Sequence, residues 1–184
     1  MRILIASDIH GSAYYCDLLM RRIEEENPER IFLLGDHLYH GPRNDLPREY
    51  DPKRVLASLN EYAHMITSVR GNCDSEVDQM VLDFPTMDDY RFVETDDIPM
   101  YLSHGHVYNK EKPIEGMKGV FLYGHTHVPD LDEREDIVFI NPGSVSIPKQ
   151  ESDHSYMMYE DGTFSWKKVE DGTVYKTYEY DKRG

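Results

Sequence analysis

Cysteine is scarce in this sequence, and long hydrophobic runs are missing from it. Two cysteines in 184 residues are too few for a disulfide framework and suit a reducing compartment. The apolar run at the N-terminus, residues 3–6, is too short for the hydrophobic segment of a signal peptide. No run approaches the roughly 18 to 20 apolar residues of a membrane-spanning helix. These absences predict a soluble, cytoplasmic protein without a membrane partner.

Basic side chains are also few. The 20 Lys and Arg residues stand against 35 Asp and Glu residues, and the formal net charge of −15 makes the average surface repel phosphate backbones and anionic lipids. Nucleic acid is therefore disfavoured as a partner, since no basic run is there to neutralise a duplex. An anionic small molecule remains open as a substrate, because a bound divalent cation reverses the local potential.

Apolar residues make up 39% of the chain, enough for one core, and the length fits a single domain over residues 1–184. Four apolar runs that end on Asp, Gly, Asn or His predict strands buried on both faces: residues 3–6, 31–34, 65–69 and 120–123. Helical spacing predicts helices over residues 12–27 and 52–62. From about Tyr90, short runs and turn signals such as Asp161-Gly162 predict further sheet, so we expect both halves to share one α/β core.

Motifs rich in potential metal ligands follow the apolar runs. They are Asp8-Ile9-His10, Gly35-Asp36, Gly71-Asn72-Cys73-Asp74, His104-Gly105-His106 and Gly124-His125-Thr126-His127. Because ligands bind outside the carboxyl ends of strands in open α/β sheets, we expect these loops to meet at one crevice. Because side chains alternate in extended backbone, we expect Asp8 and His10, and likewise His125 and His127, to point to the same side.

The chemistry of this ligand set favours a pair of metal ions. Imidazole, carboxylate and amide groups together suit borderline divalent ions such as Mn²⁺, Fe²⁺ or Zn²⁺. The ligands outnumber what one ion with an open position requires, and a carboxylate shared between two ions explains the excess. Two such ions activate a water and neutralise the oxygens of a phosphoryl group, which makes hydrolysis at phosphorus the natural reaction.

Each motif alone has an alternative interpretation. Asp8, Asp36 and Asn72 stand where turn formers and helix N-caps are common, and a single buried histidine is usually a hydrogen-bonded core residue. Solvated turns would more often carry Ser, Lys, Glu or Pro as well. The conjunction of all five motifs therefore favours a metal centre.

In order and spacing, these motifs resemble those of the calcineurin-like metallophosphoesterases and, more narrowly, of the YfcE-type bacterial phosphodiesterases. The resemblance spans about residues 1–149 and includes Gly41-Pro42-Arg43-Asn44 and residues 141–146. It implies an α/β fold, a four-layer αββα sandwich of two mixed β-sheets flanked by helices, with a dinuclear metal site at one edge.

The resemblance also implies the roles of the site residues. The implied metal ligands are Asp8, His10 and His127 for one ion, Asn72, His104 and His125 for the other, and Asp36 as the bridge. Two divalent ions are expected as cofactors, Mn²⁺ first, with Fe²⁺, Zn²⁺ and Ni²⁺ as alternatives. A metal-bound hydroxide held at Asp36 would attack phosphorus, while Asn72 and His104 help to offset the developing charge.

Cys73 departs from the pattern of the resembled family, in which a histidine at this position assists the leaving oxygen. A thiol with a pKa near 8.5 is a poorer general acid at neutral pH than an imidazole near 6.5. If Cys73 acts at all, we expect good leaving groups to be preferred; the alternative is a small buried filler.

The remaining histidines and one arginine have weaker assignments. Arg43 is a candidate for contacts to phosphoryl oxygens, or else a solvated loop charge. His106 is expected to lie beside the ligands without binding metal. His37, His64 and His154 are expected to be structural, and so is His40 unless its loop overhangs the substrate.

The sequence thus leads to a divalent-metal-dependent phosphodiesterase that hydrolyses small phosphodiesters. A phosphomonoesterase shares every metal ligand and stays open as an alternative. A non-catalytic binding module on the same fold is a further alternative, although degenerate ligands would mark it and all seven are intact. The tyrosine-rich segment 156–180 is a candidate surface for a homo-oligomer.

Overall fold

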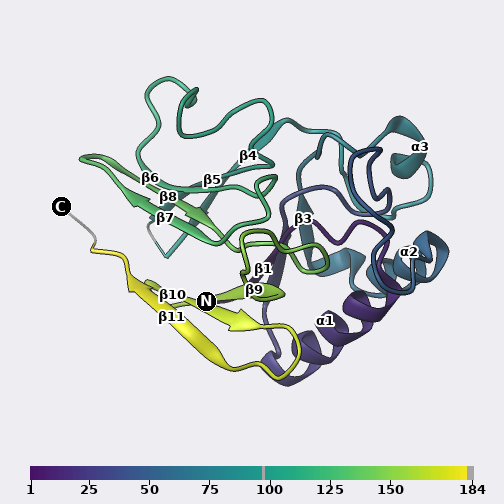
Figure 1. Ribbon diagram of the computed structural model, residues 1–184. Coiled ribbons are helices and arrows are strands. Elements are labelled where there is room, and N and C mark those ends of the chain that lie inside the picture. The colour runs from purple at the N-terminus through teal and green to yellow at the C-terminus, as the bar shows by residue number, and fades with distance from the viewer. Residues whose placement is uncertain (97, 182–184) are drawn as a thin grey trace.

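Two mixed β-sheets pack face to face in a computed structural model that describes residues 1–96 and 98–181 (Figure 1). The first sheet has the order β11-β10-β9-β1-β2-β3, with strands β1 (Arg2–Ala6), β2 (Arg30–Leu33), β3 (Ile66–Ser68), β9 (Ser155–Glu160), β10 (Thr163–Lys168) and β11 (Val174–Glu179). The second has the order β4-β5-β6-β8-β7, with strands β4 (Tyr90–Thr95), β5 (Ile98–Ser103), β6 (Gly119–Leu122), β7 (Asp130–Glu133) and β8 (Ile137–Asn141). Residues 97 and 182–184 of the predicted domain lie outside the described residues.

The two predicted helices form where their end signals place them. Helix α1 (Ala13–Glu26) begins after Ser12, whose side chain accepts a hydrogen bond from the backbone of Tyr15, and ends at Asn27 in the left-handed region. Helix α2 (Pro52–Glu61) begins with its proline, which needs no hydrogen-bond partner in the first turn. Both helices pack against the six-stranded sheet (Figure 1).

Strand β1 is buried on both faces, as its unbroken apolar run predicts. Leu4 and Ala6 point toward the helices, whereas Ile3 and Ile5 point toward the five-stranded sheet, because side chains alternate along a strand. The second group belongs to a large core cluster between the sheets that includes Trp166. The two sheets therefore share one core.

The predicted fold class is confirmed, while the outermost layer differs in detail. The outer face of the five-stranded sheet carries Phe121 and Phe139, and it is covered by side chains of the loop 104–118, including Met117. Within residues 1–96 and 98–181, the two longer helices, α1 and α2, pack on the other sheet. The third helix, α3 (Glu76–Gln79), and the 3₁₀ turn η1 (Ala63–Met65) are short. No helix in this part of the chain has the length and apolarity to cross a membrane.

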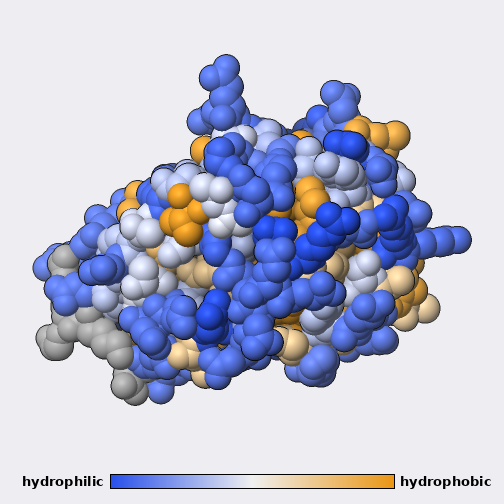
Figure 2. All heavy atoms as spheres, turned by 90° about the horizontal axis from the view of Figure 1, so that it is seen from below, coloured by the Kyte–Doolittle hydropathy of each residue, from blue (hydrophilic) through white to orange (hydrophobic). Residues whose placement is uncertain are grey.

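The C-terminal strands contain the predicted hairpin turn and the segment predicted as a surface for a homo-oligomer. Asp161 and Gly162 join β9 to β10 with φ angles of 48° and 89°, as the tight turn requires. Tyr156 and Tyr159 are buried in the core and so are not part of any apolar surface. On the face that holds α1 and β11, hydrophobic residues form small separate spots among hydrophilic ones (Figure 2).

Candidate metal centre

The predicted ligands follow the carboxyl ends of β1, β2, β3, β5 and β6, and their backbone is unusual. Five of the seven have positive φ: Asp8 (59°), His10 (50°), Asp36 (55°), His125 (66°) and His127 (60°). Such a conformation is uncommon for residues other than glycine and costs roughly 1–3 kcal/mol at each position. The loops therefore turn sharply at these five ligands, and the expected alternation in extended backbone is wrong. Sharp turns still bring the Asp8 and His10 side chains together, but they send those of His125 and His127 to different neighbours.

Glycines let these loops approach one another. A Cβ atom on Gly71 would lie 2.0 Å from Asp36 Oδ1, and one on Gly124 would lie 1.9 Å from Ser7 Oγ. Both distances are far inside van der Waals contact. The glycines of the Gly-Asn and Gly-His motifs are thus required by the packing of the loops around the centre.

One group of ligand atoms is formed by Asp8, His10 and His127, all buried. His127 Nε2 lies 3.3 Å from Asp8 Oδ1, and His10 Nε2 lies 3.5 Å from the same oxygen. The two Nε2 atoms are 3.2 Å apart. Asp8 Oδ1 is buried and has no hydrogen-bond partner among the described residues.

Hydrogen bonds at the Nδ1 atoms of His10 and His127 fix the tautomers of these two imidazoles. His10 Nδ1 donates to the carbonyl oxygen of Tyr39 at 2.8 Å, and His127 Nδ1 donates to that of Ile147 at 2.6 Å. A carbonyl oxygen only accepts, so each Nδ1 carries hydrogen and each neutral ring presents a lone pair at Nε2. Two lone pairs and an unpartnered carboxylate oxygen facing one another fit a bound cation.

A second group surrounds His104, whose Nδ1 donates to the carbonyl oxygen of Leu34 at 2.6 Å. Its Nε2 lies 3.1 Å from Asn72 Oδ1 and 3.4 Å from Asp36 Oδ2. Asp36 Oδ2 also lies 3.6 Å from His10 Nε2, so this carboxylate reaches both groups. A carboxylate in this position could contact two ions.

His125 stands apart from the tightest contacts. Its ring centre lies 5.1 Å from that of His104, and its backbone N–H donates to Asp8 Oδ2 at 3.1 Å. Partial burial and the neighbouring His104 lower the pKa of His125 to about 4, which leaves its imidazole neutral and able to bind metal at pH 7.

The buried carboxylates set the charge of the centre. Burial lowers the pKa of His104, but Asp36 and Asp8 outweigh burial and raise it to about 9. For Asp8, burial raises the pKa, yet the neighbouring imidazoles of His10 and His127 hold it well below its usual range. The same negative charge that attracts protons here attracts a metal cation, so the two compete.

Cys73 lies at the edge of the centre and is half-buried. Its backbone N–H donates to Asp36 Oδ1 at 2.8 Å and thereby orients that carboxylate. Burial, together with the charge of Asp36, raises the pKa of the thiol well above its usual range. Cys73 therefore stays protonated at neutral pH and is a weak acid.

Asp74 has a supporting position that the sequence did not reveal. Its buried carboxylate accepts backbone N–H groups from Asp36 at 2.8 Å, His37 at 2.9 Å and Gly71 at 2.7 Å. It also pairs with His37 Nδ1 at 3.0 Å, while His37 Nε2 meets Ser68 Oγ at 2.8 Å. Asp74 thus joins the loop of Asp36 to the loop of Asn72, and His37 is structural, as expected.

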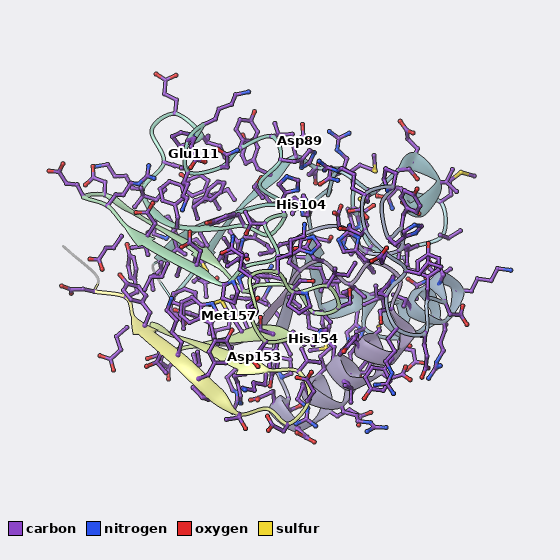
Figure 3. All side chains as sticks on the ribbon, viewed as in Figure 1. Asp89, His104, Glu111, Asp153, His154 and Met157 are labelled. Atoms are coloured by element: carbon purple, nitrogen blue, oxygen red, sulfur yellow. The ribbon has the colours of Figure 1, made fainter. Side chains whose placement is uncertain are left out.

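Two cavities meet at His125. The larger, about 670 Å³, is lined by Asp36, Asn72, Cys73, Arg43 and Lys149 among others. The smaller, about 460 Å³, lies beneath the loop 104–118. His104 lies near the middle of the molecule (Figure 3).

The structure also places the residues with weaker assignments. His40 packs edge-on against Tyr39 and Tyr50, with ring centres 4.8 and 5.0 Å away, and lines neither cavity. His106 lies next to the ligands, as expected, with its ring centre 5.4 Å from that of His104. Arg43 is exposed at the larger cavity.

Known proteins resemble this chain in sequence and in fold. Residues 1–162 match the family described as the calcineurin-like phosphoesterase superfamily domain. Phosphodiesterase YfcE of Escherichia coli (strain K12) is 41% identical over 175 residues, 95% of each chain. The solved structure of Yfce, a phosphoesterase from E. coli, has a TM-score of 0.94 and 39% identity over 98% of this chain and 100% of that one. Vps29 of Entamoeba histolytica complexed with zinc shares the fold, with a TM-score of 0.66 and 18% identity over 98% of this chain and 100% of that one.

Proposed function

Because this chain belongs to the calcineurin-like phosphoesterase superfamily and is a phosphoesterase, we propose that it hydrolyses small phosphodiesters with two divalent metal ions. The observation that carries the proposal is the convergence of three imidazole Nε2 atoms and two buried carboxylates, with Asp36 in reach of both groups. The relative that is 41% identical is named a phosphodiesterase, which supports a diester over a monoester.

The proposed ligands are those that the sequence predicts. Asp8, His10 and His127 hold one ion, Asn72, His104 and His125 hold the other, and Asp36 lies between them. Nitrogen and oxygen donors in this mixture suit Mn²⁺, with Fe²⁺, Zn²⁺ and Ni²⁺ as alternatives. The ions supply a lowered water pKa and positive charge at the phosphoryl oxygens.

The chain's own groups orient the reaction. Asp36 is held by the Cys73 N–H and by the Asp74 carboxylate beneath its loop, so its oxygens keep their direction. Arg43 and Lys149, both exposed at the larger cavity, attract an anionic ester. The Cys73 thiol at the same cavity is a weak proton donor, which favours diesters with good leaving groups.

The proposal treats residues 1–184 as one domain acting in the cytoplasm. The core shared by both sheets supports a single domain. Two free cysteines, one of them the buried Cys16, support a reducing compartment. A homo-oligomer remains a prediction, and nucleic acid remains disfavoured by the charge of −15.

Hydrolysis assays on metal-stripped protein test this function. Bis(4-nitrophenyl) phosphate and 4-nitrophenyl phosphate are compared with and without Mn²⁺, for the wild type, for Asp36→Ala and for Asp153→Ala, an exposed control carboxylate. We expect diester turnover that requires Mn²⁺, exceeds monoester turnover and is lost only in Asp36→Ala. Faster monoester turnover supports a phosphomonoesterase instead, and metal binding without hydrolysis supports a binding module.

A further inference from the structure

The smaller cavity opens beside the metal centre, on the other side of His125. It has a volume of about 460 Å³ and shares only His125 with the lining of the larger cavity, which contains Asp36 and Asn72. The His125 ring therefore stands between two separate spaces. A phosphoryl group at the centre has room for one substituent on each side.

The outer wall of this cavity is ordered by its own hydrogen bonds. Asn109 Oδ1 accepts the backbone N–H groups of Glu111 at 3.0 Å and Lys112 at 2.9 Å, and its Nδ2 donates to the carbonyl oxygen of Gly105 at 3.0 Å. Arg134 donates to the carbonyl oxygen of Lys110 at 2.8 Å. Glu111 lies on this wall, and His104 lies closer to the middle of the molecule (Figure 3). These hydrogen bonds fix the wall of the cavity, and a preformed wall reduces the entropy lost on binding.

The lining of the cavity favours an uncharged occupant. Tyr123 and Val128 contribute apolar surface. Asp130 accepts the Tyr123 hydroxyl at 2.5 Å and pairs with Lys110 Nζ at 2.9 Å, so these two charges offset each other. The remaining charge of the lining is the carboxylate of Glu111, which disfavours an anionic occupant. By contrast, Arg43 and Lys149 give the larger cavity two cationic side chains.

We propose that this cavity, called here the outer subsite, binds one ester substituent of a phosphodiester. The substituent is an uncharged group that contains a ring, such as an aryl group. The inference rests on the proposed function and deepens it. A phosphomonoester lacks the second substituent and leaves the outer subsite empty. The outer subsite thus contributes binding energy to diesters alone, which makes it a determinant of specificity.

Filling the outer subsite tests the inference. Val128→Trp places an indole in the cavity, and Glu111→Trp fills it from an exposed rim position whose replacement leaves the backbone bonds of the loop in place. Val174→Trp, at an exposed valine on β11, is the matched control. Each variant is assayed with Mn²⁺ on bis(4-nitrophenyl) phosphate and on methyl 4-nitrophenyl phosphate, which share a leaving group and differ in the second substituent.

We expect both cavity variants to lose at least tenfold in kcat/KM on the diaryl ester, mainly through KM, and less than threefold on the methyl ester. The control changes neither. Equal losses on both esters, or no loss on either, overturn the inference while the function stands. Wild-type protein that hydrolyses neither ester with Mn²⁺ overturns the proposed function and the inference together.

Discussion

Asp74→Asn is expected to destabilise the fold and the metal centre together. Asp74 Oδ2 accepts from the backbone of Asp36 and Gly71 and lies beside His37 Nδ1, whereas Oδ1 accepts from the backbone of His37. An asparagine oxygen in the Oδ2 position preserves two of the three backbone bonds. The amide NH₂ of the asparagine then faces the backbone N–H of His37, so that two donors meet. The negative charge of the carboxylate is also lost.

The expected magnitude follows from these losses. One buried donor left without a partner costs about 1–3 kcal/mol, and removing one member of a buried ion pair costs up to about 3–5 kcal/mol. Because Asn keeps part of the network, we expect Asp74→Asn to lower the free energy of unfolding by about 3 kcal/mol. The loops of Asp36 and Asn72 loosen as well, and Mn²⁺ affinity should fall about 10–100-fold, as for other residues that orient ligands.

Urea unfolding of the metal-free protein at pH 7 measures the first effect, and Mn²⁺ titration by calorimetry measures the second. Asp153→Asn is the control, because Asp153 is exposed and pairs with Lys168 at 3.0 Å on the surface. Asp153→Asn should lower the free energy of unfolding by less than about 1 kcal/mol. If Asp74→Asn costs no more than Asp153→Asn, or leaves Mn²⁺ affinity unchanged, Asp74 does not join the two loops in the way described.

Three further changes have defined outcomes. Cys73→His replaces a thiol of raised pKa by an imidazole, which can donate a proton near pH 7. The variant should hydrolyse esters with alkoxide-like leaving groups faster than the wild type. An equal or lower kcat on these esters would show that residue 73 does not protonate the leaving group. Gly71→Ala places a Cβ 2.0 Å from Asp36 Oδ1 and should abolish Mn²⁺ binding in calorimetry; retained affinity contradicts the packing. Burial raises the pKa of Asp130, but the hydrogen bonds from Tyr123 and Lys110 lower it more. The ionised Asp130 therefore stabilises the folded state above the unfolded pKa of about 3.9. This stabilisation is lost as the pH falls through the lower pKa of the folded state. Urea unfolding should show Asp130→Asn less stable than wild type at pH 7 and the gap closing in acid; a constant gap contradicts this.

Local patterns explain what the sequence predicts well. Helix α1 has a capping serine, helical spacing of apolar residues and a left-handed Asn27 at its end, all within one segment. The Asp161-Gly162 turn is likewise specified by two adjacent residues that tolerate positive φ. The ligand motifs are recognisable because each combines a buried strand with ligand-type side chains at its end.

Features that depend on distant contacts escape sequence reasoning. Strand β7 reads Asp-Leu-Asp-Glu, and it forms as an edge strand through pairing with β8 rather than through its own apolar pattern. The role of Asp74 depends on N–H groups from two different loops. The separation of His125 from His127 depends on positive φ angles that residue spacing does not indicate.

The dependence of diester hydrolysis on bound metal tests the dinuclear centre most directly. Metal-stripped protein, at a concentration far above the dissociation constant, is titrated with Mn²⁺ while the rate on bis(4-nitrophenyl) phosphate is followed. We expect the rate to rise to a plateau at two equivalents of Mn²⁺ per chain. A plateau at one equivalent, or full activity without metal, contradicts a centre in which Asp36 joins two ions.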